Sequence, residues 1–419
     1  MKYIIFFLLY SIGECISIQL VGTLSVSDLC VALYFLFLLF QGKVKKIVIC
    51  DKDLIFVTRI YIVLLLLQFF SEVLVDNSLE NMAKGLAVTI LSYMKLIFLW
   101  NIVSKRPKCI LWMFLFMSLA ALVFMDSSGD VSVSDILSGE QYSFFKFKIA
   151  PLIGQLLVVL TLIRGSRKNA YLFIFAGALC AILGARSTGL MIFFTGFIPF
   201  FLMRRKQITK KQLFAFFTIG GAVCYGLFVL YVSAVLSGSI KGGNSDFQFK
   251  QIKNPYNPIY ALLSGRSESP ASLTAIADSP WTGWGAWAQD PGWKYHKILM
   301  MFQGEKFDIN RTGINIIPAH SVILQTGVHN GIFAMLAMAI LLCFFVKIGW
   351  KSLDKFNPYY YLIVFCIMQL IWNGLFSPLS HFRGHFPIYF VCCLYSYKYT
   401  MAMRLSQRLK TNSDEAKYL

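Results

Sequence analysis

Basic residues in the polar connections of the chain are the side chains best suited to chemistry. They include Arg186, Arg266, Arg311, His320 and Arg383, the last in a His-Phe-Arg-Gly-His turn. A guanidinium group presents a planar fork that matches the oxygens of a phosphate, so the arginines suit an anionic ligand. Each arginine also has a structural alternative, because an arginine at a membrane rim can reach headgroup phosphate by snorkelling.

His320 heads the stretch His320-Ser-Val-Ile-Leu-Gln-Thr-Gly327-Val-His329-Asn-Gly331. At about 100° per residue, His320, Gly327 and Gly331 share one face of a helix. The G-x-x-x-G pair allows close contact, so we expect this face to be buried against a neighbour. A neutral imidazole is suited to taking a proton from a hydroxyl group. His329 falls on the opposite side, where we expect a packing or hydrogen-bonded role.

No pattern in the sequence indicates a metal site or a disulfide framework. The outer segments contain no D-x-D pair and no cluster of His, Cys and carboxylate residues at metal-ligand spacing. The ten cysteines lie in or beside apolar segments, where cysteine behaves as a small hydrophobic residue. We therefore expect neither a metal nor another cofactor.

The composition excludes a water-soluble globular protein. The 419 residues are 57% hydrophobic and only 14% charged, whereas soluble domains are typically about 45–50% apolar and about 25% charged. A net charge of +19 would suggest nucleic acid as the partner of a soluble protein. In a membrane protein, basic residues that flank the apolar spans on the cytoplasmic side produce the same excess, so no nucleic-acid partner is expected.

The apolar segments predict an all-α polytopic membrane protein. A spanning helix needs about 20 mainly apolar residues. Twelve segments approach this length: 3–21, 24–41, 54–75, 83–103, 109–125, 149–163, 170–185, 188–203, 212–236, 320–346, 358–376 and 387–403.

The distribution of basic residues supports this arrangement with both termini in the cytoplasm. Inside segments then hold 23 Lys and Arg residues and the short outside segments hold five, as the positive-inside rule requires. The first helix lacks a small-residue cleavage site, so we expect it to be retained. Three regions follow: helices one to nine in 1–236, a large outer loop in 237–319, and helices ten to twelve with a short cytoplasmic tail in 320–419.

The 237–319 segment is too long and too rich in tryptophan to be a passive connection. Structureless loops beyond about 12–15 residues are uncommon and often functional. Trp281, Trp284, Trp287 and Trp293 lie here, half of the eight in the chain. We expect short helices over the membrane domain. Trp284 and its neighbours suit stacking on sugar rings, with anchoring in the membrane interface as the alternative.

Charged residues fall within the predicted spans, where a charge is costly and usually has a function. Glu14, Arg59, Glu72 and Lys95 are the four considered, while Asp28, Lys84 and Lys398 also fall within the spans as drawn. Glu14 and Lys95 both lie deep in their helices, and a structural ion pair between them is one hypothesis, with the absence of such a pair as the favoured alternative.

Four short motifs in a fixed order resemble the O-antigen ligase and polysaccharide polymerase superfamily of bacterial inner-membrane proteins. They are Ala185-Arg186-Ser-Thr-Gly189, Ser264-Gly265-Arg266, Ser279-Pro-Trp-Thr-Gly-Trp-Gly285 and His320 to Gly331. The chain departs from the family in having Ser321 where an Asn usually follows the histidine, and Ala185 where a Ser usually precedes the arginine.

The resemblance implies a GT-C-like, metal-independent, inverting glycosyltransferase of the inner membrane with a periplasmic active site. Its donor would be an undecaprenyl-diphosphate-linked glycan. Arg186 and Arg266 would stabilise the departing diphosphate, and His320 would orient or deprotonate the acceptor hydroxyl. Arg383, Arg311 and Trp284 are the further substrate-binding candidates.

Three functions remain open on this basis. The favoured one is polymerisation of O-antigen or capsular repeat units, with a chain-length regulator as an optional partner. The second is ligation of the finished glycan to lipid A-core. A transporter of lipid-linked glycans, which would also carry intramembrane charges, is the third.

Overall fold

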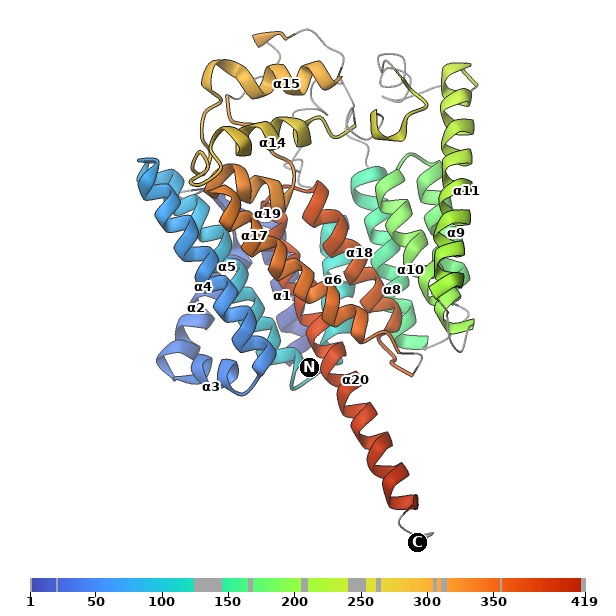
Figure 1. The fold of residues 1–419 in the computed structure, drawn as a ribbon. Coiled ribbons are helices and arrows are strands. Elements are labelled where there is room, and N and C mark those ends of the chain that lie inside the picture. The colour runs from blue at the N-terminus through green and yellow to red at the C-terminus, as the bar shows by residue number, and fades with distance from the viewer. Residues whose placement is uncertain are drawn as a thin grey trace.

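The computed structural model describes residues 2–19, 22–123, 145–164, 169–204, 210–239, 254–260, 265–303, 307–309, 315–354 and 356–415. Over these residues the chain is a bundle of helices with one short antiparallel hairpin, β1–β2 (Figure 1). Its elements are α1 (Lys2–Cys15), β1 (Ser17–Gln19), β2 (Thr23–Ser25), α2 (Val26–Phe40), α3 (Lys43–Ile49), α4 (Lys52–Leu74), α5 (Leu79–Val103), α6 (Cys109–Val123), η1 (Phe145–Ile149), α8 (Ala150–Arg164), α9 (Asn169–Ile182), α10 (Arg186–Arg204), α11 (Lys210–Leu236), α14 (Glu268–Asp278), η2 (Pro291–Trp293), α15 (Lys294–Gln303), α17 (Val322–Lys351), α18 (Tyr360–Phe376), α19 (Ser380–Gly384) and α20 (Phe386–Glu415).

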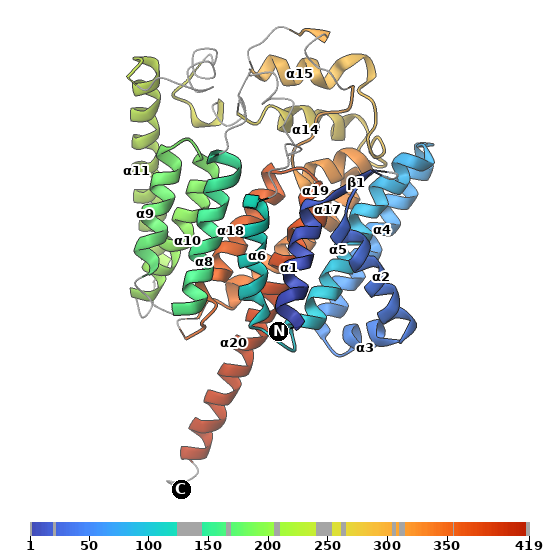
Figure 2. The ribbon, with the colours of Figure 1, turned by 180° about the vertical axis from the view of Figure 1, so that it is seen from behind.

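Two helices of the 237–319 segment, α14 and α15, lie across one end of the bundle, which we call the loop end (Figure 1). α1 begins and α20 ends at the opposite end, and α20 projects beyond the bundle there (Figures 1 and 2). α17 occupies a central place, since it packs against α4, α18 and α20 and, at the loop end, against α14.

Each of the twelve predicted spans contains a helix, but not all of these helices are long. Within the described residues, α4, α5, the η1–α8 helix and α17 are long and apolar enough to cross a membrane. The bent pair α2–α3, with an angle of 88°, makes a fifth candidate if it is one span. α1, α6, α9 and α18 are apolar but shorter. The count of twelve spans therefore remains a prediction, while the helical architecture is observed.

α17 is not the straight helix that the sequence predicts. Its backbone leaves helical geometry at Asn330 (φ −132°, ψ 15°) and Gly331 (φ 78°, ψ 179°). His320 lies ahead of the helix, because Ser321 is the N-cap. The expectation that His320, Gly327 and Gly331 share one helical face is therefore wrong. A regular rotation of about 100° per residue does not continue through the break.

Glycine allows α9 and α10 to touch along their backbones. A Cβ atom on Gly189 would lie 2.5 Å from the Ala181 nitrogen and 2.7 Å from the Gly177 carbonyl oxygen. Side chains would hold the helices apart, so small residues are what permits this contact. The approach fixes the start of α10, where Arg186 lies.

Gly189→Ala should destabilise the protein by about 1–3 kcal/mol, because the new methyl group has no room against α9. Thermal unfolding of the detergent-solubilised protein would measure the loss. Gly226→Ala is the matched control, since Gly226 lies in α11 with nothing within 4 Å of the new Cβ. Equal effects of the two substitutions would contradict the assigned contact.

Candidate functional site

The loop end has its own small hydrophobic core, which holds α14 and α15 together over α17. Ala271, Ala275 and Ile276 of α14 pack with Tyr295 and with further apolar side chains of α15 and α17, namely Leu299, Met300 and Val328. A polar cluster closes the edge of this core, where Asp278 accepts hydrogen bonds from Lys294 Nζ (2.6 Å) and Tyr295 Oη (2.7 Å). These two bonds hold the pKa of the Asp278 carboxyl below its usual range.

The Ser279–Gly285 motif wraps around the break in α17. The backbone N–H groups of Trp284 and Gly285 donate to the carbonyl oxygens of Val328 and His329, both at 2.8 Å. The N–H of Ile332 donates to the Pro280 carbonyl oxygen at 2.7 Å. Polar backbone groups released by a helix break need partners, above all away from water. The motif supplies them, so it locks the loop onto α17.

Glu72, at the loop end of α4, fastens this motif from the other side. Its Oε1 atom accepts the Ala286 N–H at 2.9 Å and the Asn330 side-chain amide at 3.3 Å. Its Oε2 atom accepts the Asn77 amide at 2.5 Å. Ser71 beside it donates to the carbonyl oxygens of Thr282 and His329. α4, the loop and the α17 break are thus tied at one buried carboxylate, which is 2% exposed.

Trp284 contributes to the packing of the loop itself. Its indole N–H donates to the Ala275 carbonyl oxygen at 2.8 Å, and its ring meets Tyr295 edge to face. His329 is buried beneath Trp287, with the ring centroids 5.8 Å apart. The packing role expected for His329 is confirmed.

Arg266 and Ser321, the residue after His320, contact the same feature, the loop end of α18. His320 precedes Ser321, whose hydroxyl accepts the Leu324 N–H at 3.2 Å and donates to the Gly374 carbonyl oxygen at 3.1 Å. The guanidinium of Arg266 lies 5.6 Å from the ring centroid of Trp372 and 5.1 Å from that of Phe376. Its Nη1 atom also donates to the Phe376 carbonyl oxygen at 3.4 Å. Arg266 and Ser321, 55 positions apart in the sequence, are therefore held against one helix end, and His320 directly precedes this contact.

Comparison with known proteins bears on this arrangement. A family model described as O-antigen ligase matches residues 171–339. This part of the chain is similar to that family. This result confirms the resemblance drawn from the motifs. No curated protein matches the chain.

The matched region, residues 171–339, contains Arg186, Arg266, Trp284, Arg311 and His320. Arg186 is exposed at the start of α10, with its guanidinium 5.0 Å from the ring centroid of Tyr231 in α11. Arg266 contacts the end of α18, and α10 packs against α18. Arg186 therefore lies on a helix next to the one that Arg266 contacts. Arg311 lies outside the described residues.

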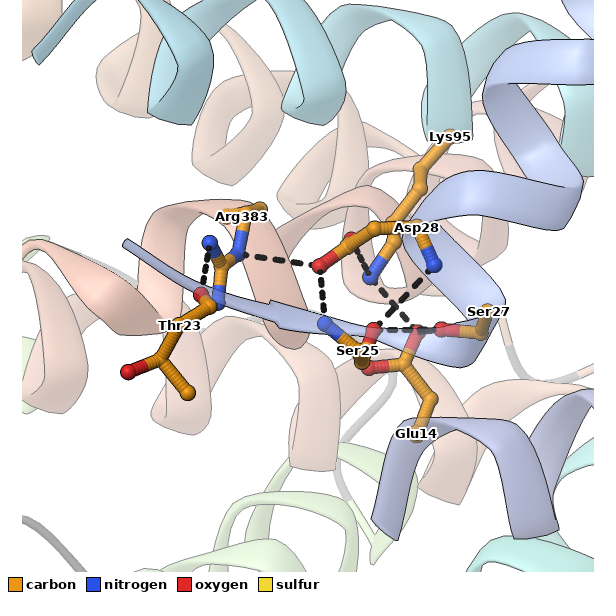
Figure 3. A network of polar contacts seen from close by, with 7 residues as sticks. All are labelled: Glu14, Thr23, Ser25, Ser27, Asp28, Lys95 and Arg383. Carbon is orange, nitrogen blue, oxygen red and sulfur yellow. Dashed lines mark hydrogen bonds and ion pairs between the residues drawn. The ribbon is translucent and has the colours of Figure 1, made fainter. Parts of the chain in front are cut away.

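Arg383 lies outside residues 171–339, and its guanidinium contacts the N-terminal part of the chain. Its Nη1 atom donates to the Thr23 carbonyl oxygen at 2.9 Å, and its Nε atom lies 3.4 Å from Asp28 Oδ2 (Figure 3). Asp28 also pairs with Lys95 at 2.7 Å, and Lys95 pairs with Glu14 at 2.6 Å. The hypothesis of a Glu14–Lys95 pair is confirmed, and the structure does not group Arg383 with Arg266.

Two contributors escaped the sequence analysis. Asp28 stands at the start of a predicted span and was not singled out, although Ser25 and Asp28 have the spacing of a helix capping box, which they form. His381 was visible as part of its turn, but only the fold brings it within electrostatic range of His320. Burial, followed by the nearby His385 and His320, lowers the pKa of His381 to about 3.

The described residues contain no group of three or more His, Cys, Asp or Glu side chains placed to hold a metal ion. The side chains gathered at the end of α18 are the Arg266 cation and two aromatic rings, and the His320 imidazole belongs to the residue before Ser321, which also contacts this end. Such a set can bind an anion and accept a proton.

Glu72→Gln should destabilise the protein by about 1–3 kcal/mol, because the new amide places an N–H group against one of the N–H donors that the carboxylate accepted. Thermal unfolding gives the free-energy change, and limited trypsin digestion at Lys294 and Lys297 reports release of the loop. Glu80→Gln is the control, since Glu80 is exposed and pairs only with Lys84 in the same helix among the described contacts. A loop as resistant to trypsin in Glu72→Gln as in the control would contradict the fastening role.

Proposed function

We propose that the protein transfers a glycan from a polyprenyl-diphosphate carrier to a sugar hydroxyl at the loop end of the bundle. The observation that carries this proposal is the placement of Arg266 and of Ser321, the residue after His320, against the same end of α18, inside the region similar to the O-antigen ligase family. Arg266 suits the leaving diphosphate and His320 the attacking hydroxyl.

The proposed reaction is a single displacement at the anomeric carbon of the donor. The acceptor oxygen forms a bond to that carbon, and the bond from the carbon to the diphosphate oxygen breaks with its electron pair. The hydroxyl proton passes to the His320 imidazole. Arg266, with Arg186 on the neighbouring helix, offsets the negative charge that develops on the diphosphate. Preorganised charge of this kind is usually the largest contribution to such catalysis.

The surroundings of Arg266 support this role. Its guanidinium rests over Trp372 and Phe376, and planar guanidinium groups favour such stacking. Stacking fixes the plane of the fork and so reduces the freedom that anion binding would otherwise remove.

Two acceptors fit this donor chemistry. Transfer to another lipid-linked repeat unit is polymerisation, and transfer to lipid A-core is ligation. The sequence favours polymerisation because a tryptophan-rich loop suits contact with a growing glycan. Trp284 does not add to this argument, because its indole packs and hydrogen-bonds within the loop. The description of the family model favours ligation as the second candidate.

The location follows from the same proposal. The chain would lie in the bacterial inner membrane, with the loop end in the periplasm and both termini in the cytoplasm. The position of the two terminal helix ends opposite α14 and α15 supports this orientation (Figures 1 and 2).

Arg266→Gln and His320→Gln should each lower glycan transfer by about 100-fold or more, the loss typical of removing one charge-stabilising group. The assay uses purified protein, an undecaprenyl-diphosphate-linked repeat unit as donor, and either a second repeat unit or lipid A-core as acceptor. Lys297→Gln is the control, because Lys297 is a loop cation whose described hydrogen bond is to a backbone carbonyl. Extension of repeat units without core would reject ligation, and product formed only with core would reject polymerisation.

Transport makes the opposite prediction in cells. A transferase variant leaves lipid-linked repeat units on the outer face of the membrane, whereas a transport-deficient variant removes them. Loss of these outer repeat units in His320→Gln would overturn the proposed reaction.

A further inference from the structure

Four charged side chains form a connected network near the loop end, between α1, α2, α5 and α19 (Figure 3). Lys95 lies 2.6 Å from Glu14 Oε1 and 2.7 Å from Asp28 Oδ1. Arg383 lies 3.4 Å from Asp28 Oδ2 and donates to the Thr23 carbonyl oxygen. Two carboxylates thus face two cations, and the network is balanced in charge.

Neighbouring hydroxyl and backbone groups complete the network. The Ser27 hydroxyl donates to Glu14 Oε1 at 2.6 Å, and the Ser25 N–H donates to Asp28 Oδ2 at 2.9 Å. The side chains of Lys95 and Asp28 are 0% and 1% exposed. Buried charges are costly and contribute little net stability compared with an apolar core, so a role in positioning is the better explanation of their presence.

The element that this network holds is α19. Arg383 is the member of the network that α19 contributes, and Phe382 beside it is fully buried against Tyr61 of α4. His381 and His385 flank them, with ring centroids 5.2 Å apart. Leu379, directly before α19, donates its N–H group to Gln325 Oε1 at 2.8 Å, in the first turn of α17 that follows His320. Fixing α19 therefore fixes an imidazole close to the proposed base.

We propose that Arg383 is a positioning residue: with Asp28, Lys95 and Glu14 it holds α19, and with it His381, against the first turn of α17 that follows His320. This inference rests on the proposed function. It replaces the anion-binding role that the sequence suggested for Arg383, because the guanidinium is already committed to Asp28 and the Thr23 carbonyl.

The state of His381 matters because His320 becomes positively charged when it accepts the hydroxyl proton. A charged neighbour would oppose that proton transfer, and a neutral one does not. Around the two α19 histidines the ionisable groups are His320 ahead of α17, Lys95 of α5, Glu14 of α1 and Arg383 of α19 itself. Burial keeps the pKa of His381 near 3, so it stays neutral throughout the physiological range as long as α19 stays in place.

A double-mutant cycle with Arg383→Gln and Asp28→Asn separates positioning from anion binding. Each single variant should lower kcat by about 10- to 100-fold with the donor KM unchanged, as expected when reacting groups are misplaced. The double variant should be no slower than either single variant, because both remove one contact. It should also unfold at a higher temperature than either, since Glu14 and Lys95 remain as a balanced pair.

Arg404→Gln is the matched control. Arg404 also pairs with a carboxylate, that of Asp354 at 3.2 Å, but in the part of α20 that leads to the opposite end of the bundle. It should leave kcat and the pH profile unchanged. A raised donor KM in Arg383→Gln, with an independent effect of Asp28→Asn, would overturn the positioning role in favour of anion binding.

A second measurement needs no activity. Hydrogen–deuterium exchange at the imidazole C2 position, followed by mass spectrometry, titrates each histidine separately. In the wild type His381 should titrate below pH 5, and in Arg383→Gln and Asp28→Asn its midpoint should move towards the ordinary value of about 6.5. The variants should then lose more activity at pH 6 than at pH 8, because His381 gains charge at the lower pH.

An unchanged midpoint in both variants would overturn the inference. If the wild type transfers no glycan but the midpoint shifts as expected, the proposed function fails while the placement of His381 by the network stands.

Discussion

Every peptide group that a membrane helix releases must find another partner, and this requirement shapes the loop end of the protein. α17 breaks at Asn330–Gly331, and the carbonyl oxygens of Val328 and His329 are taken up by backbone N–H groups of the 279–285 segment. Glu72 then binds that segment and Asn330 at once. The loop is therefore part of the membrane domain in structural terms. This junction determines where α14 and α15 lie. It also determines the positions of Trp284 and Arg266 and the point, at His320, where the chain enters α17.

The positions of the helices could be predicted from the sequence, because apolar runs bounded by charged or polar residues are strong local signals. The break in α17 could not. Gly327 and Gly331 have the spacing of a packing motif, and both are in close contact: Gly327 with Ile276 of α14, and Gly331 with the Trp281 carbonyl group. What local spacing does not reveal is that Gly331 adopts a positive φ, since that depends on the loop that docks against it.

The candidate site shows the same division. Residue types identified Arg266 and His320 as candidates. Only the fold shows that Arg266 and Ser321, the residue after His320, contact the same end of α18. A pair between Glu14 and Lys95 was one hypothesis, since each charge needed a partner in an apolar setting. Asp28 and Arg383 complete the network across more than 350 residues of sequence, and no local pattern connects them. Trp284 was nominated for sugar stacking, whereas its indole N–H is used within the loop.

The shortness of α9 has a consequence for the surrounding lipid. Its 14 residues span about 21 Å at 1.5 Å per residue, against about 30 Å for the hydrocarbon core of a bilayer. Because α9 is joined to α10 along the glycine contact, it cannot lengthen its path by tilting independently. A bilayer meeting a short apolar surface thins to match it. If α9 is the membrane span that the sequence predicts, such thinning would bring lipid headgroups closer to the start of α10, where Arg186 lies.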